Sequence, residues 1–159
     1  MEDAEFIAEI ALAMEDGLQS SSAPKLRRLY KSYDEVFPLR DEWAQRIDET
    51  FQFIQTDLSP IQTTHMTKSY SFLSLIVALI HNKWGTPNLA ASINAQPTGD
   101  FVNSPSALDR ILDLAYAHEN KDLTGPYGRY VEACIAGSNR AAQRLVRAEF
   151  LVKALQGTL

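Results

Sequence analysis

Apolar residues recur every three or four positions along most of the chain, which is the spacing of amphipathic α-helices. The pattern first predicts a helix that begins near Asp3 and ends near Gly17. Its apolar face is formed by Phe6, Ile7, Ile10, Ala11, Met14 and Leu18. A second helix is predicted after Ser22, because Pro24 suits a first helical turn, and it ends before Pro38. Its expected inner face consists of Leu26, Leu29, Tyr30 and Tyr33.

Two further helices are predicted in the middle of the chain. The first runs from about residue 39 to residue 57, and it is followed by a loop over residues 59–67. The inner face of this helix is formed by Trp43, Ile47, Phe51 and Ile54. The second covers about 68–84 and has apolar residues nearly all round, so we expect it to be the buried centre of the fold.

Residues 86–104 are rich in turn-forming residues and are predicted to be a long connector with, at most, a short helical turn at 89–94. Connectors of this length are uncommon in compact domains, and they are usually functional or mobile. We expect the connector to separate two helical subdomains.

Three more helices are predicted after the connector. The first follows Ser104 and ends near Glu119, a short one ends near Ala136, and the last covers 140–156. No alternating strand pattern, heptad array or repeat interrupts this series. The sequence therefore predicts a single all-α domain over 1–159, an irregular bundle of about seven helices around the central helix.

Charge is divided unevenly along the chain, whose net charge is −5. Residues 1–60 carry thirteen acidic and six basic side chains, whereas residues 61–159 carry seven acidic and nine basic ones. This acidic first part argues against nucleic-acid binding over the whole surface but permits a local contact.

Arg140, Arg144 and Arg147 lie at positions i, i+4 and i+7 of the last predicted helix, so they form one stripe along it. Three arginines at one-turn intervals can follow a nucleic-acid backbone. The alternative is structural, because arginines beside a buried helix cover apolar surface and pair with acids. No aromatic residues interleave the stripe as stacking platforms would, which favours the structural interpretation.

Histidine and cysteine are interpreted as structural. His81 and His118 end predicted helices, where terminal carbonyls attract a charged imidazole, and His65 lies in the predicted loop. Their spacing matches no metal-ligand pattern, so no metal site is predicted. Cys134 lies in an apolar stretch, is expected to be a buried small hydrophobe, and as the single cysteine indicates a reducing compartment.

No phosphate-binding loop, nucleophile elbow, zinc-protease motif or paired cysteine motif occurs, so no catalytic residue or cofactor is predicted. The acidic start lacks the order of a signal peptide, and the longest apolar stretch is too short to span a bilayer. A cytoplasmic protein without membrane partners is expected.

Three sequence blocks together resemble a known family. They are Asp3-Ala4-Glu5-Phe6-Ile7, the segment from Lys68 to Leu75, and the segment from Asn139 to Leu151. In order and approximate spacing they resemble the helical region of the GmrSD-type family of bacterial modification-dependent restriction and phage-defence proteins. The resemblance implies that, in proteins of this family, the helices follow a ParB/sulfiredoxin-like domain with a DGQQR-type motif implicated in nucleotide hydrolysis. An HNH-type nuclease domain often accompanies it.

Neither of those catalytic motifs occurs in this chain, so the resemblance transfers no catalytic residue. It covers most of the chain through diffuse hydrophobic patterns. Only Lys68, Arg140, Arg144 and Arg147 match its polar landmarks, and they are the candidate nucleic-acid contacts.

The leading hypothesis is a non-catalytic helical module of such a defence protein. It would pack against a nucleotide-sensing or nuclease domain or subunit and regulate it, with DNA as a further candidate partner. The alternative is a free-standing helical adaptor or regulator that binds another protein. A third hypothesis is a nucleic-acid binder in its own right.

Overall fold

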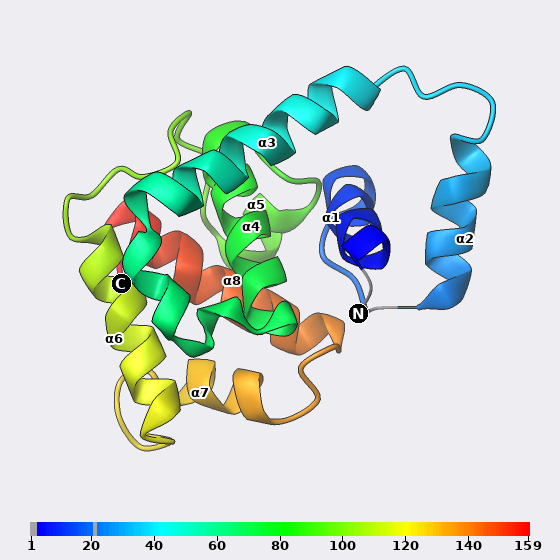
Figure 1. Cartoon of the computed structure of the whole chain (residues 1–159). Helices are drawn as coiled ribbons and strands as arrows, with labels where there is room; N and C mark the ends of the chain where they lie inside the picture. Colours follow the sequence, from blue (N-terminus) through cyan, green and yellow to red (C-terminus); the bar gives the residue numbers. More distant parts are fainter. Residues whose placement is uncertain (1–2, 21) are drawn as a thin grey trace.

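The computed structural model describes residues 3–20 and 22–159, and these residues form helices and loops without strands (Figure 1). The predicted all-α class is thus confirmed. In the described part of the chain there are eight α-helices and two short 3₁₀ helices: α1 (Asp3–Asp16), α2 (Ala23–Ser32), α3 (Arg40–Asp57), η1 (Ser59–Thr63), η2 (His65–Thr67), α4 (Ser69–Trp84), α5 (Leu89–Ile93), α6 (Ala107–Glu119), α7 (Gly128–Ile135) and α8 (Ala141–Gln156).

Two segments differ from the sequence-based expectation. The expected loop at 59–67 is wound into η1 and η2, whereas the short helical turn allowed for at 89–94 is found as the helix α5. The helix after the connector begins at Ala107, because the Ser104 hydroxyl accepts from the Ser106 amide and forms a turn ahead of the first helical residue.

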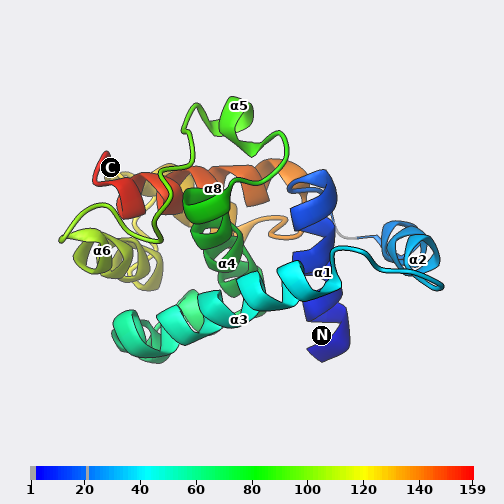
Figure 2. The same ribbon diagram turned by 90° about the horizontal axis from the view of Figure 1, so that it is seen from above.

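Helix α4 is the centre of the bundle, as its all-round apolar pattern predicts. Every residue from Leu73 to Asn82 is buried. In both views α4 lies between α3 and α8 (Figures 1 and 2), and α8 is the helix that packs against it most extensively. Helix α1 and the short helix η2 pack against other parts of α4.

One glycine shows how the chain ends a helix and packs closely at the same point. Gly17 follows α1 with φ of +81°, a left-handed backbone conformation that side chains with a Cβ rarely adopt. A Cβ added there would lie 2.4 Å from the Pro87 carbonyl oxygen. Glycine therefore allows the end of α1 to lie against the beginning of the connector.

The long connector is held against the end of α4 by Asn82. The Asn82 side-chain amide donates to the carbonyl oxygens of Asp100 and Phe101 and to Asn103 Oδ1, at 3.0, 3.1 and 2.8 Å. Gln156 of α8 donates to the Asn82 Oδ1 atom at 2.8 Å. A single buried side chain thus joins α4, the connector and α8.

One main hydrophobic core contains residues from the helices on both sides of the connector. Its buried members range from Ile10 in α1 to Leu155 in α8, and α4 supplies the largest share of them. The helices before and after the connector therefore share one hydrophobic core.

Helix α2 stands apart from this core. It lies beyond α1, away from the rest of the bundle, in both views (Figures 1 and 2). A small second cluster joins it to α1 through Ala8, Leu12, Leu26 and Leu29. Because α2 relies on this limited contact, a concave surface is left between the two helices.

Candidate functional site

The structure separates the four candidate nucleic-acid contacts into two kinds. Arg144 and Arg147 are buried, with 5% and 0% of their surface exposed, whereas Arg140 and Lys68 are exposed. Arg144 and Arg147 lie within α8, which packs against α4, α6 and α7, whereas Arg140 and Lys68 precede the first residues of α8 and α4.

Arg147 has a structural role, because it joins several segments of the fold through hydrogen bonds. Its Nε atom donates to Ser74 Oγ at 3.0 Å, and its two terminal nitrogens donate to the carbonyl oxygens of Ala133 and Ser138 at 2.6 and 2.7 Å. The guanidinium carbon also lies 5.5 Å from the centre of the Tyr70 ring. Burial lowers the pKa of Arg147. One guanidinium thus ties α8 to α4, α7 and the turn that precedes α8.

Arg144 is bound to an acid of α1. Its terminal nitrogen donates to a Glu9 carboxylate oxygen at 2.7 Å, and both side chains are enclosed. The assignment of Arg144 and Arg147 as nucleic-acid contacts is therefore corrected: both guanidinium groups are covered by protein and cannot reach a phosphate in this conformation. Only Arg140 and Lys68 of the candidate set remain accessible.

His81 has a structural role, but its cause differs from the expected one. Its Nε2 atom donates to the Ala95 carbonyl oxygen at 3.0 Å, and its Nδ1 atom accepts from the Thr86 amide at 3.1 Å. Burial lowers the pKa of His81. A neutral ring therefore ties the connector to α4, whereas attraction by terminal carbonyls would have required a charged one.

The structure brings His65, His118 and Cys134 together. One ring nitrogen of each histidine and the Cys134 sulfur all lie within 4.8 Å of one another. The two imidazole rings are stacked, with centres 3.9 Å apart and planes inclined by 20°. These side chains come from η2, the end of α6 and α7, and we call them the His–Cys cluster.

Two tyrosines flank the His–Cys cluster. The Tyr130 hydroxyl lies 3.1 Å from His65 Nε2, and the Tyr70 hydroxyl lies 3.5 Å from His118 Nε2. Among the described residues, neither His65 Nδ1 nor His118 Nδ1 has a hydrogen-bond partner, although both atoms are buried. Each ring is thus positioned through one nitrogen while the other is left unpaired.

The environment keeps the cluster uncharged. Burial lowers the pKa of His65 to about 3, with smaller contributions from His118 and Arg147. Burial also lowers the pKa of His118 and raises the pKa of the Cys134 thiol. The thiol sulfur lies 4.0 Å from His65 Nε2. A protonated thiol at this distance is not an activated nucleophile, so the geometry does not favour cysteine-dependent catalysis.

Sequence reasoning missed this cluster because its three members come from separate elements. The sequence pattern was interpreted for each histidine separately, as a residue at a helix end or in a loop. Only the packing of α6 and α7 against η2 and α8 places them side by side.

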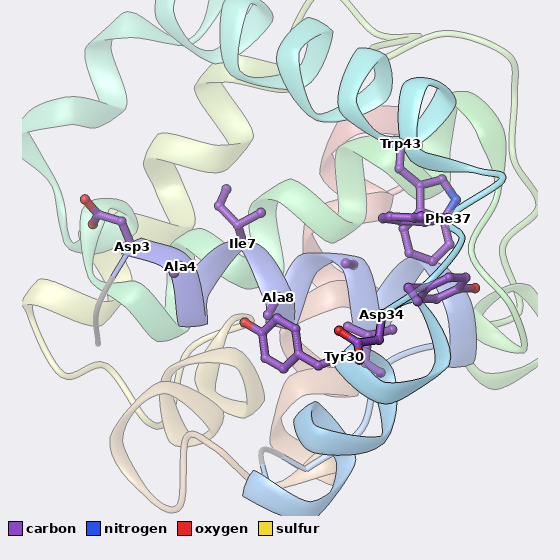
Figure 3. Close-up of a pocket in the computed structure, with 11 residues that line it drawn as sticks. Asp3, Ala4, Ile7, Ala8, Tyr30, Asp34, Phe37 and Trp43 are labelled. Atoms are coloured by element: carbon purple, nitrogen blue, oxygen red, sulfur yellow. The ribbon is translucent and has the colours of Figure 1, made fainter.

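A second candidate site is the groove between α1 and α2, with a volume of about 640 Å³ (Figure 3). Helix α1 forms one wall, α2 forms the other, and the segment that joins α2 to α3 closes one end. The groove is lined by Asp3, Ala4, Ile7, Ala8, Ala11, Leu29, Tyr30, Tyr33, Asp34, Phe37 and Trp43. We call this surface the α1–α2 groove.

Aromatic rings form the closed end of the α1–α2 groove. The Tyr33 and Phe37 rings are stacked with centres 4.3 Å apart, and Phe37 meets Trp43 edge-on at 5.2 Å. Along the open part, Ile7 is 41% exposed and Tyr30 is 56% exposed. The helical spacing predicted that Tyr30 belongs to the inner face of α2. Its exposure shows that this prediction is wrong. Exposed apolar surface of this kind marks binding sites in folded proteins.

Acidic groups accompany this apolar surface. Asp3 and Asp34 line the groove, and both are exposed. In Figure 3, Asp3 lies at one end of the groove, beyond Ile7, and Asp34 lies beside Tyr30. The site thus combines apolar walls with negative charge at its edges.

Within the described ranges, no helix has both the length and the apolar character that a membrane crossing requires. No family model, no curated protein and no solved structure matches this chain.

Proposed function

We propose that this chain is a helical binding module and that its α1–α2 groove holds one helix of a partner protein. The groove itself carries the proposal, because it is an open apolar channel with exposed Ile7 and Tyr30 on its walls and aromatic rings at one end. An amphipathic helix laid into an apolar groove is a recurrent mode of protein recognition.

The walls favour a helix over a flat partner surface. Four lining residues of α1 lie at positions i, i+3, i+4 and i+7, a helical spacing that forms one continuous ridge: Ala4, Ile7, Ala8 and Ala11. Tyr30 and Tyr33 of the opposite wall lie three residues apart. Apolar side chains at positions i, i+3, i+4 and i+7 of a partner helix would pack between these two rows.

Charge indicates the chemistry of that helix. Asp3 and Asp34 flank the groove, and residues 1–60 carry seven more acidic than basic side chains. Complementary charge steers encounter and selects among partners. The proposed occupant is therefore an apolar helix with lysine or arginine beside its apolar face.

The family resemblance supplies a biological setting for this module. In that setting the partner is the nucleotide-sensing domain or subunit of a GmrSD-like restriction and phage-defence protein, and the module regulates its state. DNA contact would depend on the exposed Arg140 and Lys68. An independent adaptor would use the same groove for a partner outside such a system.

The groove is tested with a synthetic helical peptide that carries leucine at i, i+3, i+4 and i+7 and lysine elsewhere. Isothermal titration calorimetry should detect its binding to the wild-type protein. Tyr30→Glu should weaken binding by about tenfold or more, because it places a charge in an apolar contact. The matched control is Tyr116→Glu, since Tyr116 is also exposed, at 70%, but belongs to α6 and not to the groove.

Binding that survives Tyr30→Glu, or that is equally lost with Tyr116→Glu, would refute the groove as the docking site. A peptide with glutamate in place of lysine should bind more weakly, and equal binding would refute the charge argument. The non-catalytic assignment is tested separately on the purified chain with nucleoside triphosphates and with DNA. Turnover of either substrate would contradict it.

A further inference from the structure

We infer that His65, His118 and Cys134 form a binding site for a zinc-class transition-metal ion. The site lies between η2, α6 and α7 and is separate from the α1–α2 groove. It would add a metal-dependent element of stability to the binding module, whatever partner that module takes.

The donor set matches the chemistry of such ions. Imidazole nitrogen and cysteine sulfur are the common zinc ligands, and three protein donors of this kind hold the ion in many sites. The three donor atoms lie within 4.8 Å of one another. Ligand atoms around one tetrahedral zinc ion are about 3.3 to 3.8 Å apart, given bonds of about 2.0 to 2.3 Å. A contraction of about 1 Å would therefore complete the arrangement.

Both histidines of the cluster also carry a buried ring nitrogen without a hydrogen-bond partner in the described part of the chain. His65 is only 7% exposed, yet its Nδ1 atom has no hydrogen-bond partner among the described residues, and the same holds for His118 Nδ1. Buried polar atoms without partners are rare in folded proteins. Metal-binding histidines typically use one nitrogen for the ion while the other is held by a hydrogen bond. Tyr70 lies 3.5 Å from His118 Nε2 and can hold that ring in this way. On His65 it is Nε2 that lies 4.0 Å from the Cys134 sulfur, so Nε2 would be the ligand nitrogen and would exchange its 3.1 Å contact with the Tyr130 hydroxyl for the ion.

Protonation also favours coordination by the histidines. Their lowered pKa values keep both rings neutral at physiological pH, so no proton competes for the nitrogen lone pairs. The thiol differs, because burial raises the pKa of Cys134 while the charge of Arg147 acts in the opposite direction. Binding would form the metal–sulfur bond and release the Cys134 proton to solvent.

Binding requires one local rearrangement. The stacked rings of His65 and His118 cannot both direct an in-plane lone pair at the same ion, so the rings must splay apart. His118 is only partly buried and stands at the end of α6, so it is the ring that can turn. The nearby positive charge of Arg147 limits the affinity for a divalent cation.

The test uses the untagged full chain, stripped of metal with a chelator, and Co²⁺ as a spectroscopic substitute for Zn²⁺. One equivalent of Co²⁺ should produce the near-ultraviolet charge-transfer band of a cobalt–thiolate bond. Zn²⁺ should abolish that band and raise Tm by about 5 to 10 °C at a hundredfold excess over its Kd. Cys134→Ala should remove the band, and His118→Ala should weaken binding by about tenfold or more.

Glu119→Gln is the matched control, because it removes the exposed carboxylate next to His118 and should leave both signals unchanged. Circular dichroism establishes that each variant is folded. If the folded wild-type protein gives no thiolate band and no rise in Tm with Zn²⁺, the site does not exist. A rise in Tm that persists in both Cys134→Ala and His118→Ala would likewise overturn the inference, because the ion would then be bound elsewhere.

Discussion

Arg144 of α8 donates a 2.7 Å hydrogen bond to Glu9 of α1, and the two residues are 135 positions apart in the chain. Their side chains are 6% and 1% exposed. Glu9 Oε1 and Arg144 Nε have no further partner within the described residues. The pair thus fixes α1 against α8, although two of its polar atoms remain unsatisfied.

Removal of one partner should be far more harmful than removal of both. Glu9→Gln should lower the free energy of unfolding by about 3 kcal/mol, because it leaves a buried guanidinium without its counter-charge. The double variant Glu9→Leu/Arg144→Met should lie within about 1 kcal/mol of the wild type or above it. Urea denaturation measures both values. Equal losses in the single and double variants would contradict this explanation.

The exposed ion pair between Arg28 and Asp16 provides the control for this experiment. Arg28 is 65% exposed and Asp16 is 31% exposed. Solvent screens such pairs, so Asp16→Asn should change the free energy of unfolding by less than about 1 kcal/mol.

Asn82 should be essential for the conformation of the connector. Asn82→Asp places a carboxylate opposite three oxygen acceptors, those of Asp100, Phe101 and Asn103, and should lower stability by about 2 to 4 kcal/mol. Hydrogen exchange should show faster exchange of the Thr98 and Asn103 amides, while the middle of α4 changes less. Unaltered exchange at these amides would show that the connector is held by other contacts.

Any DNA binding should be weak and only shallowly dependent on salt. Arg144 and Arg147 are enclosed, so at most Arg140 and Lys68 of the candidate set can contact phosphates. Two contacts predict a slope of about −2 or less steep in a plot of log K against log salt concentration. Fluorescence anisotropy at several salt concentrations measures it for the wild type and for Arg140→Ala. A slope near −4 would require phosphate contacts that this interpretation omits.

The pH dependence of stability should report the buried His65. Its pKa is about 3 in the folded protein, against about 6.5 in an unfolded chain. Between these values the unfolded state binds a proton that the folded state does not, so stability is complete above about pH 6.5 and falls as pH decreases. His65 alone should contribute a slope approaching about 1.4 kcal/mol per pH unit below about pH 6.

Metal-free protein in chelator is required for this measurement, and His65→Leu is the informative variant. Urea denaturation at about pH 7 and about pH 5.5 should show a smaller decrease for the variant than for the wild type. An identical decrease would mean that His65 is protonated in the folded state as well. His81, whose pKa burial also lowers, remains in both proteins and acts as the internal reference.

Local pattern was sufficient to predict the helices and the centre of the fold. The run from Leu73 to Ile80 is apolar on all sides of the helix, and only a position at the centre of a bundle buries all of them. The start of α2 after Ser22 could be predicted in the same way. In the structure the Ser22 hydroxyl caps this helix by accepting from the Lys25 amide. These features depend on residues close together in sequence.

Features that depend on distant residues could not be read in the same way. The spacing of Arg144 and Arg147 fits an exposed stripe and a buried brace equally well, and the choice depends on Glu9 and Ser74 in other helices. The exposure of Tyr30 depends on how far α2 lies from the bundle. The His–Cys cluster, likewise, exists only because three separate elements meet.

The burial of α4 by α8 has a consequence for biosynthesis. Residues 85–140 separate the two helices, so the ribosome must add these and then α8 itself before the side of α4 that packs against α8 can be covered. At about 5 to 20 residues per second, this interval lasts several seconds. Throughout that time the nascent chain exposes the apolar side of α4 that α8 will cover, which makes it a natural substrate for chaperones that bind hydrophobic segments during translation.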